Sequence, residues 1–203
     1  MKINQGMGLS IVIMRLIELV FPRRETERRV AAVNALEPRR ASIVIDGVTI
    51  HFALSYADPA VRSLITEAKF HNHHHAQKLL GIVTKDALAT LAVCDRVIPM
   101  PLSNRRYRER GYNQLEQILH AGGVTYAASL LTRTHTQPQT ELDRSRRRQN
   151  VAGSFTLASG AEIAGKHLVL IDDVVTTGAT MLAARAELAR HSPASITCFA
   201  LAH

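Results

Sequence analysis

Cysteine, tryptophan and long hydrophobic runs are scarce or absent in this 203-residue sequence. Cys94 and Cys198 are too few for a disulfide framework or a four-cysteine zinc site, which favours a reducing, cytoplasmic setting. The longest apolar run, residues 9–21, is interrupted by Arg15 and Glu18, and it is shorter than the roughly 20 residues of a membrane span. We therefore expect no integral membrane segment. Residues 9–21 are interpreted as an amphipathic helix that docks on the body, with contact to a membrane surface as the alternative.

Aromatic residues make up only 4% of the chain, which argues against a long stacking platform for single-stranded nucleic acid. Positive charge, in contrast, is abundant, because the net charge is +8. It is concentrated in residues 105–150, which carry nine Arg against four acidic residues, and in residues 1–40, which carry eight basic against four acidic residues. Such clusters indicate a polyphosphate substrate, a nucleic acid, or both, and a merely solvated basic face is the alternative.

The pattern of apolar residues and turn signals predicts an α/β protein. Asp46-Gly47 lies between two apolar runs and predicts a β-hairpin. The end of the chain predicts a βαβ unit of a strand, a helix and a second strand, and the apolar first strand suits a buried parallel sheet. The other expected elements are helices at 22–38, 58–69, 75–93 and 113–119, strands at 96–100 and 129–134, and a long polar loop at 135–150. In the βαβ unit, the expected bounds are 166–171, 179–190 and 195–201.

The loop inside this βαβ unit carries the clearest chemical signal. An apolar strand runs into Asp172 and Asp173, and a Thr-rich, Gly-containing loop leads directly into a helix. The N–H groups and dipole at a helix N-terminus form an anion site, and Gly178 permits close approach of the backbone. Two carboxylates beside a phosphate make sense if they accept hydrogen bonds from ribose hydroxyls. The alternative is an ordinary strand end with a capped helix.

This loop resembles the signature of the type I phosphoribosyltransferases, which is an apolar strand, two acidic residues, two variable residues and T-T/S-G-x-T. The resemblance implies that the loop binds the ribose 5-phosphate part of 5-phosphoribosyl 1-diphosphate (PRPP). The corresponding residues here are Asp172, Asp173, Val174, Val175, Thr176, Thr177, Gly178, Ala179 and Thr180.

Two further blocks resemble the ComF family, competence-associated proteins with a phosphoribosyltransferase domain. The first is Pro99-Met100-Pro101-Leu102 with Arg106 and Arg110-Gly111-Tyr112-Asn113-Gln114, and the second runs from Thr136 to Phe155. Ala68-Lys69-Phe70 resembles a Lys-aromatic segment of the same family. The four-cysteine zinc module of typical members has no counterpart after Pro22, which leaves any role that depends on the module without support.

The resemblance implies a type I phosphoribosyltransferase-like fold, a mainly parallel sheet flanked by helices, with an N-terminal helical and hairpin appendage. We divide the chain into an appendage at 1–40 and a phosphoribosyltransferase-like domain at 41–203. Transfer to an acceptor needs positive charge for the leaving pyrophosphate, and Mg²⁺ is expected to arrive bound to PRPP. The candidate pyrophosphate-binding residues are Lys69, Pro99, Met100, Arg133 and Arg147, and Arg147 is also grouped with Asp172 and Asp173 as catalytic. Loop 135–150 is the expected lid.

The leading hypothesis is a PRPP-dependent phosphoribosyltransferase linked to competence and DNA uptake, with an unidentified acceptor. The alternative is a non-catalytic PRPP-sensing or single-stranded-DNA-binding module with a helicase-like partner, and an RNA-binding regulator is a third class. A homodimer is possible for each. The nucleic-acid candidates are Arg105, Arg106, Arg108 and Arg110. The histidines at 71 and 73–75 carry no recognisable metal spacing, so no metal ligands are assigned.

Overall fold

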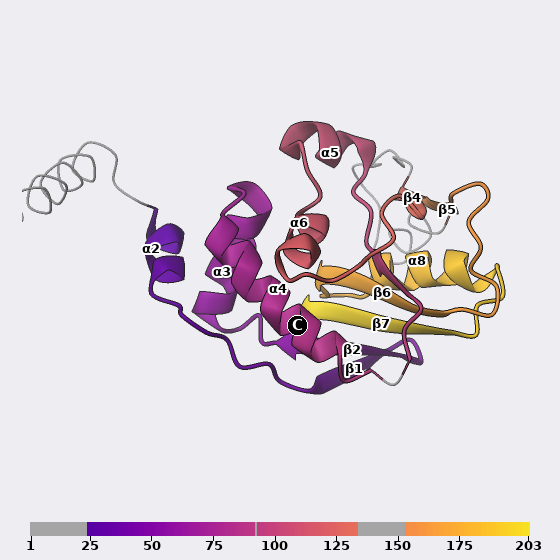
Figure 1. Cartoon of the computed structure of the whole chain (residues 1–203), viewed down its shortest axis with the longest axis horizontal. Helices are drawn as coiled ribbons and strands as arrows, with labels where there is room; N and C mark the ends of the chain where they lie inside the picture. The colour runs from indigo at the N-terminus through magenta and orange to yellow at the C-terminus, as the bar shows by residue number, and fades with distance from the viewer. Residues whose placement is uncertain (1–23, 92, 134–152) are drawn as a thin grey trace, which may run out of the picture.

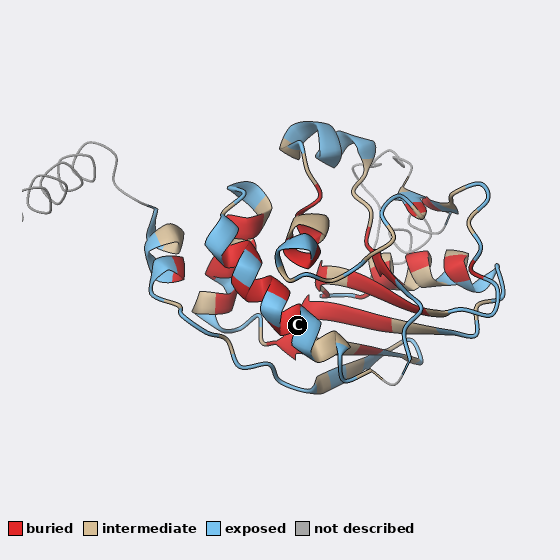
Figure 2. Cartoon of the chain, in the orientation of Figure 1, coloured by how far each residue is buried: buried red, intermediate tan, exposed pale blue. Residues whose placement is uncertain are grey.

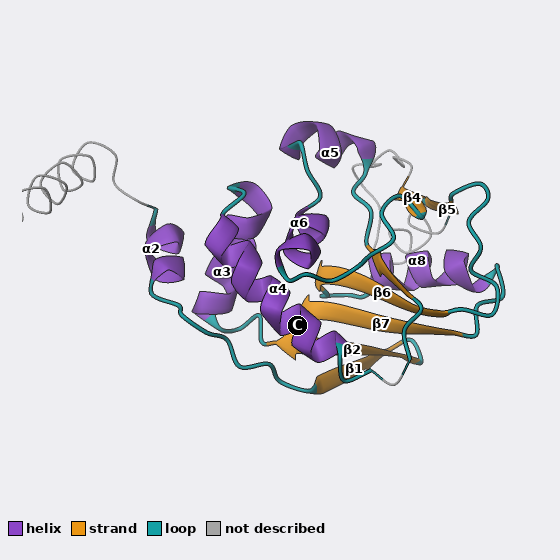
Figure 3. Cartoon of the chain, viewed as in Figure 1, coloured by secondary structure: helices purple, strands orange, loops and turns teal. Residues whose placement is uncertain are grey.

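The computed structural model describes residues 24–91, 93–133 and 153–203. Its centre is a five-stranded sheet whose strands lie in the order β1-β2-β7-β6-β3 (Figures 1 and 3). Only β1 is antiparallel to its neighbour, and the other three pairings are parallel. The strands are β1 (Ala41–Ile45), β2 (Val48–Leu54), β3 (Arg96–Pro99), β6 (His167–Val174) and β7 (Ser195–Ala202). The predicted α/β class with a mainly parallel sheet is confirmed.

Helices lie over the sheet, and a small two-stranded ribbon of β4 (Leu131–Arg133) and β5 (Phe155–Leu157) stands apart from it (Figure 1). In Figure 1, α4 lies in front of the sheet and α8 lies behind it. The helices are α2 (Glu25–Ala31), α3 (Pro59–Phe70), α4 (His74–Leu88), α5 (Asn104–Arg110), α6 (Gln114–Ala121) and α8 (Ala179–Ala189).

The predicted hairpin is confirmed, and it belongs to the main sheet. Asp46 and Gly47 have φ angles of 49° and 76°, the left-handed values of a two-residue hairpin turn. β2 pairs in parallel with β7, with Ile50 opposite Cys198, so the hairpin extends the central sheet at one edge. This placement brings the end of β1 close to the loop before α8, where Ile45 meets Gly178.

Three helices differ from the sequence-based expectation. α2 ends at Ala31 rather than near Pro38, and α4 ends at Leu88 rather than at Val93. α5 was not expected as a helix, because none of its residues is buried and it has no apolar period to detect. Its signals are at its ends, where Ser103 caps the first turn and Gly111 adopts a φ of 81°.

The core lies on both faces of the sheet, where buried residues follow β6 and β7 (Figure 2). Leu168, Val169, Leu170 and Ile171 are at most 1% exposed, which explains the continuous apolar run of β6. α2 packs against α3 and buries Val30 completely. The first expected helix, residues 9–21, lies outside the described residues. No helix in the described ranges has the length and hydropathy needed to cross a bilayer.

Candidate phosphoribosyl-binding site

The candidate site lies where the parallel strands β3 and β6 end side by side. Pro99 pairs with Ile171, and the N–H of Met100 donates to the Ile171 carbonyl at 2.8 Å. The chain then leaves β3 toward α5 and α6, whereas β6 leads into α8. Crevices at the carboxyl ends of neighbouring parallel strands are the usual ligand sites of open α/β sheets. The position of Asp172 and Asp173, directly after Ile171, is therefore where such a site belongs.

β6 is longer than the sequence indicated and includes both carboxylates. The strand continues to Val174, and the N–H of Val175 donates to the Ala202 carbonyl of β7 at 3.2 Å. The N–H of Val174 donates to Asp173 Oδ1 at 2.8 Å. The amides of Val174 and Val175 are thus bonded within the protein, which shifts the expected anion contacts toward Thr176–Thr180. There the first-turn N–H groups of α8 have no acceptor inside the helix.

Gly178 shapes this loop. It is the N-cap residue of α8 with a φ of 72°, and a Cβ at this position would lie 2.9 Å from Cδ1 of Ile45. A side chain would therefore be strained by the backbone angle and would also collide with the end of the hairpin. The loop from Val174 to Met181, together with Asp172, lines a cavity of about 50 Å³. The residues of the predicted phosphate loop hence face one common space.

Asp172 is a perturbed carboxylate at the rim of this cavity. Burial, followed by the negative charge of Asp173, raises the pKa of Asp172 to about 7. Lys69 and Arg133 act in the opposite direction and lower the pKa, so both cations are within electrostatic reach of this carboxylate. A strongly perturbed carboxylate in a pocket is typical of functional sites.

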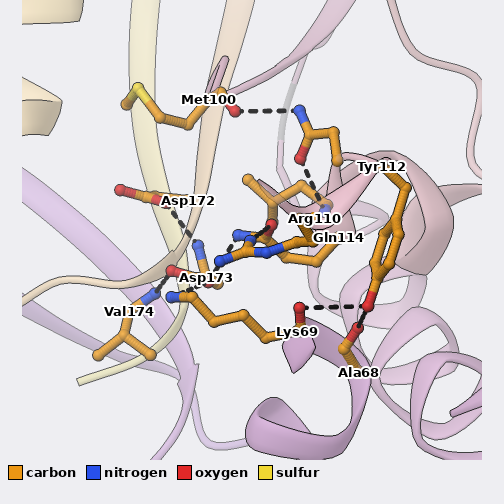
Figure 4. Close-up of polar contacts among 11 residues, drawn as sticks. Ala68, Lys69, Met100, Arg110, Tyr112, Gln114, Asp172, Asp173 and Val174 are labelled. Atoms are coloured by element: carbon orange, nitrogen blue, oxygen red, sulfur yellow. Dashed lines mark hydrogen bonds and ion pairs between the residues drawn. The ribbon is translucent and has the colours of Figure 1, made fainter. Parts of the chain in front are cut away.

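Asp173 has a different environment, because it is 5% exposed and held by contacts from two helices (Figure 4). Its Oδ2 accepts from Lys69 Nζ of α3 at 2.7 Å and from Gln114 Nε2 of α6 at 2.8 Å. Gln114 Oε1 in turn accepts from Arg110 Nη1. Arg110 also lies over the Phe70 ring, 5.2 Å from its centroid. Burial lowers the pKa of Arg110.

The segment around Gln114 carries part of the family resemblance, and the structure supplies a role for its residues. The Tyr112 hydroxyl donates to the carbonyls of Ala68 and Lys69 at 3.2 Å, which fixes the end of α3. Asn113 Nδ2 donates to the Met100 carbonyl at 3.2 Å, and Asn113 caps α6. The Arg-Gly-Tyr-Asn-Gln spacing was the available signal, but the contacts of Tyr112 and Gln114 with residues 43 to 59 positions away are not visible in a single sequence.

The candidate pyrophosphate-binding residues separate into three groups. The charges of Lys69 and Arg133 both lower the pKa of Asp172. The Arg133 guanidinium lies 5.3 Å from the centroid of the Phe155 ring, and burial lowers the pKa of Arg133. Pro99 ends β3 and lines a cavity of about 170 Å³ together with Arg133, whereas Met100 is buried with its N–H and carbonyl bonded within the protein. Arg147 and the expected lid lie outside the described residues.

The four candidate nucleic-acid arginines lie on α5. Arg105, Arg106 and Arg108 are exposed, and Arg105 pairs with Glu109 at 2.7 Å. Arg110 differs, because it is turned toward Phe70 and Gln114. The structure thus keeps three of the four on a basic surface and brings the fourth into the Asp173 network.

The histidine cluster and the cysteines have structural environments. His73 caps α4, and the His75 ring contacts the Val33 carbonyl at 2.9 Å. The described residues include no group of three or more His, Cys, Asp or Glu that could hold a metal ion. Cys94 is exposed, Cys198 is buried, and neither forms a disulfide.

Comparison with known proteins agrees with this geometry. The family model described as "Phosphoribosyl transferase domain" matches residues 119–203, which include the whole loop and β7. "Competence protein F" of Haemophilus influenzae is 33% identical over 138 residues, which are 62% of this chain and 60% of that protein. "DNA utilization protein YhgH" of Shigella flexneri is 30% identical over 157 residues, 70% of this chain and 67% of that protein. The chain belongs to the ComF family. Its fold is accordingly of the type I phosphoribosyltransferase class.

A solved structure with a similar fold is the orotate phosphoribosyltransferase of Mycobacterium tuberculosis. The two chains are 15% identical, and the match covers 85% of this ComF-family chain and 80% of the other, with a TM-score of 0.39. A likeness this distant gives no information about the reaction.

Proposed function

We propose that this ComF-family protein binds PRPP with Mg²⁺ and transfers its phosphoribosyl group to an acceptor with release of pyrophosphate, in a process linked to competence and DNA uptake. The observation that carries the proposal is the continuous lining of one cavity by Asp172 and the loop from Val174 to Met181. Loop amides and the N-terminal dipole of α8 suit a phosphate, and a carboxylate beside them suits ribose hydroxyls.

Different residues around the cavity bind different parts of the ligand. The amides of Thr176–Thr180 bind the 5-phosphate in this proposal, and Asp172 binds the ribose. Breaking the bond between the anomeric carbon and pyrophosphate leaves positive charge on the ribose and adds negative charge to the leaving group. The Asp172 carboxylate stabilises the first charge, and the cations Lys69 and Arg133 stabilise the second. The acceptor then donates an electron pair to the same carbon, and an acceptor that attacks through an N–H or O–H group loses that proton to solvent or to the released pyrophosphate.

Mg²⁺ fits this set of donors as an ion carried by the substrate. It prefers oxygen ligands, retains several waters and is usually held by substrate phosphates with one or two carboxylates. Asp172 offers such a carboxylate, and the described residues offer no larger acidic cage. Bound Mg²⁺ would supply charge neutralisation on the pyrophosphate group.

The experiment is calorimetric titration of PRPP with Mg²⁺ into the wild type, Asp172→Ala, and the double variant Asp172→Ala/Asp173→Ala. Asp86→Ala is the control, because Asp86 is an exposed aspartate on α4 outside the site. We expect saturable binding by the wild type and the control, and loss of binding in the double variant. Equal binding by all four proteins would contradict the proposal.

A pyrophosphate-release assay distinguishes an enzyme from a non-catalytic PRPP-binding module. Pyrophosphate release from PRPP is measured with candidate acceptors, each at saturating PRPP. Release that depends on one acceptor identifies a transferase, whereas PRPP binding without acceptor-dependent release identifies a sensor. The cytoplasmic location and the homodimer stay predictions from the sequence.

A second candidate function, binding of single-stranded nucleic acid, is favoured by α5. The helix carries four arginines and has no buried residue, and Tyr107 on it is 54% exposed. Exposed arginines with an aromatic ring suit a phosphate backbone and an unstacked base. A helicase-like partner on the same DNA is part of this proposal.

Salt dependence tests the α5 surface. Removing two phosphate contacts with Arg106→Ala/Arg108→Ala should lower the slope of log K against log salt by about 1.4, since each contact contributes about 0.7 on single strands. Arg28→Ala/Arg62→Ala removes two exposed arginines elsewhere and serves as the charge-matched control. Equal slopes for the two variants would contradict a specific role of α5.

A further inference from the structure

The two adjacent carboxylates of β6 cannot do the same work, because the strand separates them. Side chains of successive residues in a strand point to opposite sides of the sheet. β6 extends through Val174, so Asp172 and Asp173 follow this alternation. Figure 4 shows Asp173 directed to Lys69 and Gln114, with Asp172 on the other side of the strand. Asp172 lines the cavity with the phosphate loop, and Asp173 is not among the residues that line it.

Three donors from the protein occupy Asp173. Lys69 Nζ and Gln114 Nε2 both bind Oδ2, and the N–H of Val174 binds Oδ1. Its side chain is 7% exposed. A carboxylate has about four lone-pair positions, so little capacity is left for a ligand. In Asp172, Oδ1 accepts from the N–H of Asp173 at 2.8 Å, and the residue is more exposed.

The orientation of Gln114 is fixed by a chain of contacts behind it. Gln114 Oε1 accepts from Arg110, so Nε2 is the end of the amide that faces Asp173. Arg110 is held over the ring of Phe70, the residue directly after Lys69 on α3. The network thus joins α3, α5, α6 and β6, and the Lys69 ammonium is its cation on α3. The Lys69 side chain is 24% exposed, and its charge also lowers the pKa of Asp172 across the strand.

We infer that Asp173 and Gln114 are positioning residues that present the Lys69 ammonium to the diphosphate end of the ligand, while Asp172 alone takes the ribose end. The inference rests on the proposed function, because it assigns residues to the two ends of PRPP. An ordered ammonium lets the chain bind the diphosphate without first restricting a long, flexible side chain. Lys69 is thereby the residue that contacts the ligand, and Asp173 and Gln114 act through it.

The test uses the two halves of the ligand as separate probes, each with Mg²⁺: inorganic pyrophosphate and ribose 5-phosphate. Lys69→Met and Asp173→Asn should weaken pyrophosphate binding at least tenfold and change ribose 5-phosphate binding less than threefold. Asp172→Asn should show the reverse pattern. Gln114→Leu, which changes no charge, should weaken pyrophosphate binding about threefold. Gln117→Leu on the same helix is the matched control and should change neither affinity.

A damaged fold weakens the binding of both pyrophosphate and ribose 5-phosphate, whereas loss of a positioning residue weakens the binding of pyrophosphate alone. The comparison of the two affinities therefore distinguishes positioning from structural support. Folding of each variant is followed by thermal unfolding, and if Asp173→Asn does not fold, Lys69→Met and Gln114→Leu decide. Tighter pyrophosphate binding by Asp173→Asn would show that the ion pair withholds Lys69, and it would overturn the inference. Unchanged pyrophosphate binding by Lys69→Met would overturn it as well. A wild type that binds neither probe would overturn the proposed function together with the inference, whereas ribose 5-phosphate binding alone would overturn the inference and preserve the function.

Discussion

Replacing Asp172 by Asn should stabilise the protein at alkaline pH while it removes ribose binding. Asp172 is held in a partly buried position next to Asp173, where its charged form is disfavoured. The amide of Asn has nearly the same shape and no charge. Functional residues commonly cost stability in this way, because a site is organised for a ligand rather than for the empty protein.

The magnitude follows from the difference between the folded and unfolded states. The pKa of Asp172 rises from 3.8 to about 7 on folding, and each tenfold change in proton affinity corresponds to about 1.36 kcal/mol. The pKa of this carboxyl is higher in the folded state than in the unfolded state. Below about pH 4 the carboxyl is protonated in the folded state and largely so in the unfolded state, so it has little effect on the free energy of unfolding. The free energy of unfolding falls as the pH rises from about 4 toward 7. The free energy of unfolding falls by about 4 kcal/mol at most over this pH range. This value is an upper limit, because the carboxyl is partly exposed and water stabilises its charged form.

The assay is urea unfolding of the wild type, Asp172→Asn and Asp86→Asn between pH 4.5 and pH 8.5. The advantage of Asp172→Asn over the wild type should grow from about 1 kcal/mol at pH 4.5 to a few kcal/mol and level off above pH 7. Asp86→Asn, exposed on α4, should show no such growth. A difference between Asp172→Asn and the wild type that does not depend on pH would refute the electrostatic account.

Three further substitutions test the structure around the site. Gly178→Ala should abolish phosphate binding and destabilise the fold by about 1–2 kcal/mol, because it strains a positive φ and meets Ile45; calorimetry and thermal unfolding measure both. Glu67→Gln should destabilise by about 1–3 kcal/mol in urea unfolding at pH 7, since Glu67 is fully buried and binds Arg24 and Thr26. Gly81→Ala should destabilise by about 2 kcal/mol or more in the same assay, since a Cβ at this point of α4 would overlap the backbone of α6.

Gly178→Ala has a matched control variant, and the other two substitutions have outcomes that would contradict the packing. Gly160→Ala changes a positive-φ glycine with open space around it, so it should cost stability without affecting phosphate binding. Hydrogen bonds from Arg24 and Thr26 outweigh burial and lower the pKa of Glu67, so the wild type should lose this contribution as the pH falls below about 4.5. If Glu67→Gln had the same free energy of unfolding as the wild type at pH 7, the packing of α2 against α3 would be contradicted. If Gly81→Ala had the same free energy of unfolding as the wild type, the packing of α4 against α6 would be contradicted.

Local signals predicted the elements that depend on neighbouring residues. The Asp46-Gly47 turn requires only two adjacent residues with left-handed φ angles, and the apolar run of β6 follows from burial on both faces. The ends of helices were harder to predict. For example, α4 ends at Leu88 although apolar residues continue beyond it in the sequence. α5 was missed because its stabilising features are caps rather than an apolar face.

The α/β class and the strand, loop and helix that carry the predicted phosphate loop could be read from the sequence alone, because these three elements are contiguous along the chain. The roles within that pair, in contrast, depend on how the elements pack. Asp172 and Asp173 are neighbours in the sequence, but the pleat of β6 turns them to opposite sides, and α3 and α6 bring Lys69 and Gln114 to only one of them. These partners lie 104 and 59 residues away from Asp173, a separation that only the packing of helices on the sheet can close.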